Sequence, residues 1–407
     1  MSRKLIIILL LVLLVLNITG CAIQKTNKDT IENQVKPNTE LTKNMADWAV
    51  ELFKETYQEG ENLLISPTSV LMALSMTANG ADNETLAQME KVLGRGLTID
   101  EINKSIAAYL KKIEDVEDVH IANSIWINAI ESLKIKDEFV NTNKKYYNAE
   151  IYSEVFSDKA ADKINNWVDK NTHGMINKLI DNISPQSIMY LINAIAFESE
   201  WEEEYAEYHV FDDIFTNHEG EEKNIEMMFS EEDKYFDDGK AIGFIKLYKD
   251  NKFSFVAILP NEDVELKDYI SEMSGEGLSN LISSYRKAKV DAYLPKFTYS
   301  YDIKMKDVLV NMGIVNAFDE LKADFSKMAD AGAENIYINQ VIHKTFIEVD
   351  EKGTKAAAVT GVEMNITSAV IDEERYIVRL DRPFIYMIID NETNTPLFMG
   401  VVADIGK

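Results

Sequence analysis

The 407-residue chain has little cysteine, proline and basic charge. Its 1 cysteine excludes an internal disulfide framework and a metal site built from cysteine pairs. Lysine and arginine number 42 against 69 aspartates and glutamates, which gives a net charge of −27. Such a charge repels a phosphate backbone and lacks the counterion release that drives binding to it. Nucleic acid is therefore not expected as a partner, and the acidity indicates a well-hydrated surface.

The motifs that identify common enzymes are also missing. The sequence contains no G-x-S-x-G nucleophile elbow, no phosphate-binding G-x-x-x-x-G-K-[ST] loop and no zinc-binding H-E-x-x-H. Its 5 histidines are scattered, and acidic runs such as 202–204 and 212–213 are typical of a solvated surface. We therefore predict a protein that is not an enzyme and that uses no cofactor and no metal.

The N-terminus has the order of an export signal. Arg3 and Lys4 precede an apolar run over 5–16, which is shorter than the ~20 residues of a membrane-spanning helix. Residues 18–21 (ITGC) resemble the bacterial lipobox, whose cysteine receives a lipid; the alternatives are an uncleaved anchor or a chance cysteine. We interpret 1–20 as a signal peptide, Cys21 as lipidated and 21–42 as a flexible tether. The protein would then be exported, as a cell-envelope lipoprotein held at a membrane or to the extracellular space.

Helical and strand-like patterns separate along the remaining chain. Apolar residues at helical spacing predict helices over 44–57, 84–93, 102–113, 137–146 and 160–171, and Ser66 and Pro67 open another that ends near residue 80. β-branched and aromatic runs predict strands over 188–197, 241–247, 253–259, 290–294, 336–349, 376–380, 384–389 and 397–403. Early helices and late strands without regular alternation indicate an α+β fold, in one domain over 43–407.

The segment over 351–360 (EKGTKAAAVT) combines features of a loop and of a strand. It follows a strong strand, yet its small side chains have little bulk to pack. Read with a period of two, one face carries Thr354, Ala356, Ala358 and Thr360. Such a segment can be exposed or paired within a sheet, with Gly353 as the hinge. The alternatives are a simple exposed strand or a turn of alanine-rich helix.

Motifs spread over 44–403 resemble the serpin family of protease inhibitors, in the order that the family has them. They are 62–67 (NLLISP) with Gly80 and Ala81, 122–126 (ANSIW), 191–197 (LINAIAF) with Trp201, 294–297 (LPKF), 341–344 (VIHK) and 381–384 (DRPF). The resemblance implies helices packed around a large central mixed β-sheet, with smaller sheets and an exposed reactive loop over about 350–375.

The resemblance also implies a suicide mechanism. A protease cleaves the loop and is trapped as its acyl-enzyme while the loop inserts into the central sheet. The inserting hinge would consist of Gly353, Thr354, Ala356, Ala357, Ala358 and Thr360. Residues that match the family's control of sheet opening are Trp201, Lys296 and Glu351 at the top of the sheet and Ser66, Asn193 and His343 beneath it.

The cleaved bond is assigned by counting along the reactive loop. About fourteen residues from Gly353, as the family's loop usually runs, lies Thr367–Ser368, with Ile366, Met364 and Arg375 as alternatives. The side chains around this bond suit an elastase- or subtilisin-like serine protease. We therefore expect a monomeric inhibitor of serine, and also cysteine, proteases. A non-inhibitory binding or carrier protein of the same fold is the alternative, and the small residues on the inward face of the hinge favour the inhibitor.

Overall fold

Helices and sheets are arranged as an α+β fold in a computed structural model that describes residues 39–113, 116–129, 133–185, 187–330, 335–354 and 374–406. The helices are α2 (Thr39–Thr56), α3 (Pro67–Ala78), α4 (Asn83–Met89), α5 (Ile99–Ile113), α6 (Asp137–Tyr147), α7 (Asp158–Asn171), α8 (Leu266–Glu272), α9 (Gly275–Ser283) and α10 (Lys306–Asn311). Shorter helical turns are η1 (Glu90–Gly94), η2 (Glu207–His209), η3 (Lys249–Asn251) and η4 (Asn316–Phe318). The predicted fold class is confirmed.

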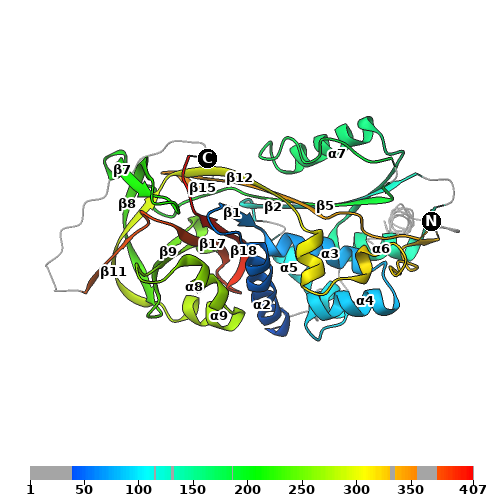
Figure 1. Ribbon diagram of the computed structural model, residues 1–407, viewed down its shortest axis with the longest axis horizontal. Coiled ribbons are helices and arrows are strands. Elements are labelled where there is room, and N and C mark those ends of the chain that lie inside the picture. Colours follow the sequence, from blue (N-terminus) through cyan, green and yellow to red (C-terminus); the bar gives the residue numbers. More distant parts are fainter. Residues whose placement is uncertain are drawn as a thin grey trace, which may run out of the picture. The chain divides into compact units, whose positions relative to one another are not determined.

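The largest sheet has nine strands (Figure 1). Its order is β1 (Leu63–Ile65), β18 (Thr395–Val402), β17 (Phe384–Asp390), β10 (Phe253–Pro260), β9 (Ala241–Leu247), β8 (Glu222–Asp237), β11 (Arg286–Pro295) and β16 (Arg375–Arg379), with β7 (Val210–Thr216) beside β8. Strands β17 and β18 are buried along their whole length, as their continuous apolar runs predict.

Three smaller sheets complete the β structure. A three-stranded sheet has the order β4 (Glu150–Glu154), β2 (Val119–Asn128) and β5 (Met189–Phe197). A four-stranded sheet has the order β12 (Phe297–Lys304), β14 (Ile342–Val349), β15 (Gly353–Thr354) and β6 (Ser199–Glu200). A two-stranded sheet joins β13 (Ala329–Asp330) to β3 (Lys134–Ile135).

Helix α3 begins at a strong local signal and lies entirely in the core. The Ser66 hydroxyl caps it by accepting a hydrogen bond from the Ser69 N–H at 3.3 Å, and Pro67 occupies the first helical position, where no backbone donor is needed. All of its residues are buried. The indole N–H of Trp48 on α2 donates to the carbonyl of Pro67 at 3.0 Å and ties the two helices together.

Helices α7 and α3 pack on opposite faces of strand β5 (Figure 1). On the α7 side, Ile164 and Trp167 form an apolar cluster with Trp126 of β2 and Ile192 of β5. Every second residue of β5 faces this cluster, and the residues between them face α3, because alternate side chains of a strand point to opposite faces. Any change in the spacing of the strands beneath α7 must therefore also move this helix.

Several predicted boundaries differ from the structure, and the two largest differences are at the starts of α2 and β14. Helix α2 begins at Thr39, so its first turn lies within the segment predicted as a tether over 21–42. The strand predicted over 336–349 begins only at Ile342. Ile336 and Ile338 are buried, each 4% exposed, but they are not part of a strand. An alternation of apolar residues indicates that one side of a segment is buried. A segment can be buried in this way without pairing with a neighbouring strand.

Candidate functional site

The segment predicted as a hinge begins inside a sheet. Gly353 and Thr354 form β15, which pairs antiparallel with Val349 of β14 on one side and with Ser199 and Glu200 of β6 on the other. A Cβ atom on residue 353 would lie 2.1 Å from the carbonyl oxygen of Ser199. Glycine is therefore required here by the close approach of β6, and the expected hinge starts as a paired strand.

Thr354 is buried and held by a tyrosine that the sequence did not indicate. Thr354 is only 2% exposed, and its hydroxyl oxygen lies 2.6 Å from the hydroxyl oxygen of Tyr248. The ring of Tyr248 stacks on Trp201 with a centroid separation of 4.5 Å and an interplanar angle of 12°. Burial raises the pKa of Tyr248, so its hydroxyl stays protonated and can donate.

Trp201 also fixes the turn between β14 and β15. Its indole N–H donates to the carbonyl of Asp350 at 2.9 Å, and its backbone N–H donates to the carbonyl of Lys352 at 2.8 Å. The tryptophan is 2% exposed. A single side chain thus contacts both the tyrosine that holds Thr354 and the turn that precedes it.

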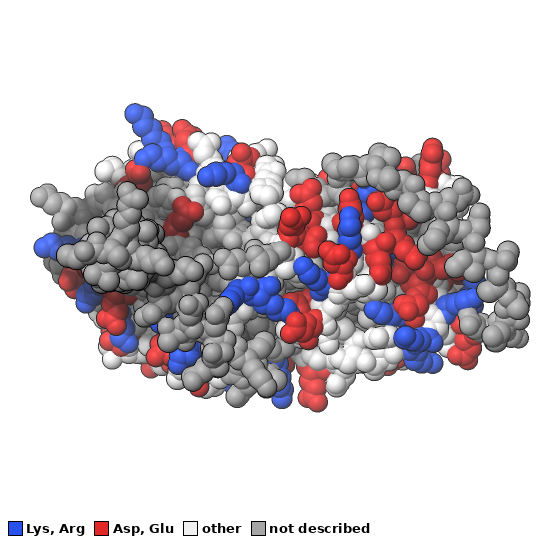
Figure 2. Space-filling view, turned by 180° about the vertical axis from the view of Figure 1, so that it is seen from behind, with Lys and Arg blue, Asp and Glu red and all other residues white. Residues whose placement is uncertain are grey.

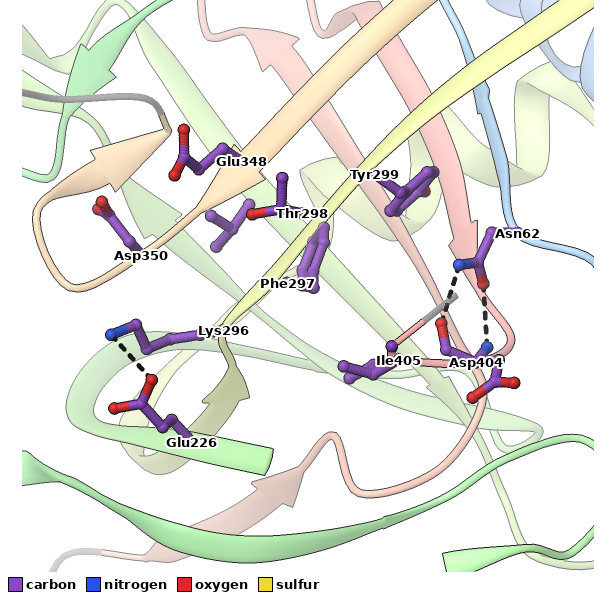
Figure 3. A pocket seen from close by; sticks show the side chains of 12 residues that line it. Asn62, Glu226, Lys296, Phe297, Thr298, Tyr299, Glu348, Asp350, Asp404 and Ile405 are labelled. Carbon is purple, nitrogen blue, oxygen red and sulfur yellow. Dashed lines mark hydrogen bonds and ion pairs between the residues drawn. The ribbon is translucent and has the colours of Figure 1, made fainter. Parts of the chain in front are cut away.

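Lys296 connects the start of β12 with the same turn. Its ammonium lies 2.9 Å from a carboxylate oxygen of Glu351 and 3.3 Å from one of Glu226. The hydrogen bond from Lys296 lowers the pKa of Glu351. A pocket of about 320 Å³ lies next to this ion pair. Figure 3 shows Lys296 and Glu226 on one side of the pocket and Asn62 with Asp404 on the other. We call Trp201, Tyr248, Lys296, Glu351 and Thr354 the hinge end of the site.

A second group of polar side chains connects β14, α3, β5 and β2. His343 accepts a hydrogen bond from the Ser66 N–H at 3.0 Å, and Ser66 in turn caps Ser69. The Ser69 hydroxyl donates to the amide oxygen of Asn193, and the Asn193 amide donates to that of Asn123. The structure therefore brings the predicted Ser66, Asn193 and His343 into one network, which we call the central polar cluster. Ser69 and Asn123 are members that the sequence interpretation missed.

The hydrogen bond at His343 requires a neutral ring. Its acceptor is Nε2, which must carry no proton to receive the Ser66 N–H. The side chain is buried, and this burial lowers its pKa to about 4. At neutral pH the ring is thus an uncharged acceptor, as its place in the network demands.

The hinge end and the central polar cluster lie along one boundary, between β5 and β14. The two strands are neighbours but belong to separate sheets, and within the described residues no strand ladder joins them. At the hinge end, β15 closes this boundary by pairing β14 with β6, the short continuation of β5. An additional strand could therefore pair with β14 and β5 at this boundary.

A buried ion pair next to Trp201 was not indicated by the sequence interpretation. The Lys246 ammonium lies 2.8 Å from Glu232, also donates to the carbonyl of Glu203, and is placed 4.5 Å from the ring centroid of Tyr205. Lys246 is only 2% exposed, in an otherwise apolar strand. The sequence did contain a signal for this ion pair, namely a lysine within an otherwise apolar run over 241–247.

Several predicted site residues lie outside the described residues. They are Cys21, Ala356, Ala357, Ala358, Thr360, Met364, Ile366, Thr367 and Ser368. Arg375, the remaining alternative for the cleaved bond, lies on β16 and forms ion pairs with Asp291 at 2.6 Å and Glu231 at 2.9 Å. In the described part of the chain, no helix has both the length and the apolar content to cross a bilayer.

The fold agrees with comparisons to known proteins. The family profile described as "Serpin (serine protease inhibitor)" matches residues 43–405. The chain belongs to the serpin family. This serpin is 30% identical to an uncharacterized serpin-like protein of Thermococcus kodakarensis over 376 residues, which cover 91% of this chain and 86% of that protein. The resemblance expected from the sequence motifs is thereby confirmed, as is the predicted serpin fold.

Three solved structures, of two different proteins, give the comparison more detail. The thermophilic serpin tengpin in its native state is 44% identical, with a TM-score of 0.87 over 91% of this chain and 96% of that one. Its latent state gives a lower TM-score, 0.81. Thyroxine-binding globulin in complex with thyroxine is 25% identical, with a TM-score of 0.79 over 90% of this chain and 100% of that one. Serpins are in general protease inhibitors, and a ligand-binding protein shares their fold.

Proposed function

We propose that this serpin inhibits a serine protease as a suicide substrate, by inserting its cleaved loop between β5 and β14. The placement of β15 carries the proposal, because the first hinge residues already pair between β14 and β6. The absence of a ladder between β5 and β14 in the described chain supports the same path for the rest of the hinge. Ala356, Ala358 and Thr360 would become buried in that strand, which their small side chains permit.

The covalent step uses the nucleophile of the protease. Its serine oxygen attacks the carbonyl carbon of Thr367, the bond to the nitrogen of Ser368 breaks, and that amine leaves with a proton from the enzyme. The protease remains bound to Thr367 as an ester while the freed segment inserts. A cysteine protease would be held as a thioester in the same way.

The target would be an elastase- or subtilisin-like enzyme that accepts Thr367, with Ile366 and Met364 as alternatives. Arg375 is the least suitable alternative, because its two ion pairs on β16 would have to break before it could enter a protease pocket. Inhibition would take place outside the cell or at its envelope, where a lipid on Cys21 would hold the protein at a membrane.

The decisive experiment mixes the protein with a panel of serine and cysteine proteases and looks for a complex that survives detergent. Sequencing the released C-terminal peptide then identifies the cleaved bond. Cleavage without a stable complex, and without a rise in Tm of the cleaved protein, would exclude loop insertion.

A non-inhibitory carrier is the second candidate, supported by the similarity to thyroxine-binding globulin. It predicts a loop that is cleaved as an ordinary substrate. A protein that forms no complex with any protease but is stabilised by a small apolar ligand would favour this candidate.

A further inference from the structure

The outer face of the nine-stranded sheet and the adjoining turn η2 carry a group of apolar and aromatic side chains that range from half-buried to largely exposed. Tyr293 of β11 lies opposite Phe229 of β8 and opposite Arg379 of β16, so these residues share one face. Ile377 precedes Arg379 by two residues and lies on that same face. We call the group the aromatic patch; its members are Tyr208, Phe211, Phe229, Tyr293 and Ile377.

The members of the patch are linked by ring contacts. The rings of Phe229 and Tyr293 are 5.2 Å apart, and those of Phe211 and Tyr293 are 6.4 Å apart. His209 connects Tyr208 to the rest, at 4.3 Å from Tyr208 and 5.3 Å from Phe229. The patch is therefore continuous across β7, β8 and β11, and Ile377 extends it to β16.

Phe229 and Tyr293 are half-buried, but burial does not explain the other three members of the patch. The alternate residues Met228, Ala292 and Val378 are 0% exposed and form its core-facing side. In contrast, Tyr208 is 81% exposed, Ile377 63% and Phe211 38%. Contiguous exposed apolar groups mark interaction sites more often than single ones do, and aromatic residues are enriched at protein interfaces.

The charges around the patch indicate the partner's surface. The two arginines nearest to it are paired within this chain, Arg375 with Glu231 and Asp291 and Arg379 with Asp213. Figure 2 shows acidic side chains gathered on the half of the molecule that carries the nine-stranded sheet, seen from the face turned away in Figure 1. A basic partner surface would be attracted to this half.

The chain connectivity places a protease beside the patch. Strand β16 starts at Arg375, and the eight residues from 368 to 375 span at most about 28 Å when extended. A protease domain of about 230 residues is about 45 Å across. An enzyme bound at Thr367 must therefore stand near β16 and its neighbours.

We propose that the aromatic patch is a second docking surface for the target protease, which meets it with an apolar surface rimmed by basic side chains. This inference rests on the proposed inhibitory function and adds a contact outside the reactive loop. The patch would set how fast the enzyme is captured, whereas the hinge would decide whether the cleaved loop inserts or the enzyme is released.

The test compares two double variants of the full chain with subtilisin and pancreatic elastase. Tyr208→Ala with Ile377→Ala should slow the formation of the detergent-resistant complex about tenfold and leave the stoichiometry of inhibition unchanged. The control, Val155→Ala with Leu321→Ala, removes two apolar side chains that are 68% and 91% exposed elsewhere, and should keep the wild-type rate. The wild-type rate should also fall as the NaCl concentration rises.

The outcomes separate the two proposals. If the wild-type protein forms no complex with any protease, the inhibitory function itself fails. If the complex forms and the patch variant matches the wild-type rate, the aromatic patch does not dock the protease. The same conclusion follows if the variant changes the stoichiometry of inhibition instead of the rate. A rate that is independent of salt would contradict the basic rim. The single variant Tyr208→Lys, at the most exposed member, repeats the test if the double variant loses stability.

Discussion

The boundary between β5 and β14 is built differently at its two described parts. At the hinge end, backbone pairing of β15, a stacked pair of aromatic rings and an ion pair hold the chain together. At the central polar cluster, no backbone pairing joins β14 to β5 in the described chain. The connection runs through hydrogen bonds that each involve a side chain, from His343 through Ser66 to Asn123. One part is closed by a strand, and the other is bridged by hydrogen bonds that can break singly.

This difference indicates where the sheet can open at least cost. A side-chain hydrogen bond contributes about 0.5–1.5 kcal/mol, and a few of them must be lost for β14 to move away from β5. The hinge end costs more, because a strand, an aromatic stack and a buried hydroxyl pair must separate together. Opening in the centre, with the hinge strand already in place, would let the rest of the hinge enter behind it.

The largest expected effect comes from placing a charge in the closed part. We expect Thr354→Arg to expel β15 from its position, because a guanidinium without a partner cannot stay where Thr354 is 2% exposed. Loss of the pairing and of the bond to Tyr248 should reduce the free energy of unfolding by about 2–4 kcal/mol. The guanidinium would also destabilise the inserted state. The protease would then cleave the loop and be released without forming a stable complex. Denaturant titration and the stoichiometry of inhibition measure the two effects.

The matched variant is Thr354→Ser, which keeps the hydroxyl and the small volume. It should retain both stability and covalent complex formation. An arginine variant that still traps protease at the wild-type stoichiometry would mean that residue 354 is not on the inward face.

The central polar cluster should weaken in acid because of His343. Its pKa is about 4 when folded and about 6.5 in an unfolded chain, so the unfolded state takes up the proton first. The stabilisation is complete above pH 6.5 and is lost as the pH falls toward 4, with a total of about 3 kcal/mol. Denaturant titrations across this range should show the loss.

The control for this prediction is His343→Gln, whose amide oxygen can accept the Ser66 N–H without titrating. The difference in stability between the two proteins should depend on pH between 6.5 and 4 and be constant above it. Parallel curves for the two proteins would exclude a buried, neutral His343.

The hydroxyl pair at the hinge end allows a direct measure of its coupling. Tyr248→Phe and Thr354→Val each leave one buried hydroxyl without its partner and should cost about 1–2 kcal/mol. The double variant removes both groups and should cost less than the sum, by about 1 kcal/mol. Strictly additive effects in denaturant titration would show that the two hydroxyls do not interact.

Much of the fold could be predicted because its signals are local. Ser66 and Pro67 mark the start of α3, and continuous apolar runs mark β17 and β18. The prediction of a strand over 336–341 was wrong. Ile336 and Ile338 are buried alternate residues, but their backbone does not form a strand. Helices α8 to α10 were not predicted; they have only 7, 9 and 6 residues.

The site was predictable only where family motifs marked it. Trp201, Lys296 and His343 were identified by resemblance, and nothing in their local sequence states their contacts. Tyr248 was missed because its role depends on Thr354, more than 100 residues away. Asn123 lies in the family motif over 122–126, but its place directly opposite Asn193 became known only from the strand register.

The smallest expected effect concerns the ion pair of the hinge end. Lys296→Gln should cost only about 0.5 kcal/mol, because the side chains of Lys296 and Glu351 are 26% and 37% exposed and solvent screens their attraction. The difference should disappear in 1 M NaCl, where the screening length is about 3 Å. Lys240→Gln, which breaks a more exposed pair with Glu272, is the control and should cost still less. A loss of several kcal/mol at Lys296 would mean that the ion pair, rather than the stacked rings and the hydroxyl pair, holds the hinge end closed.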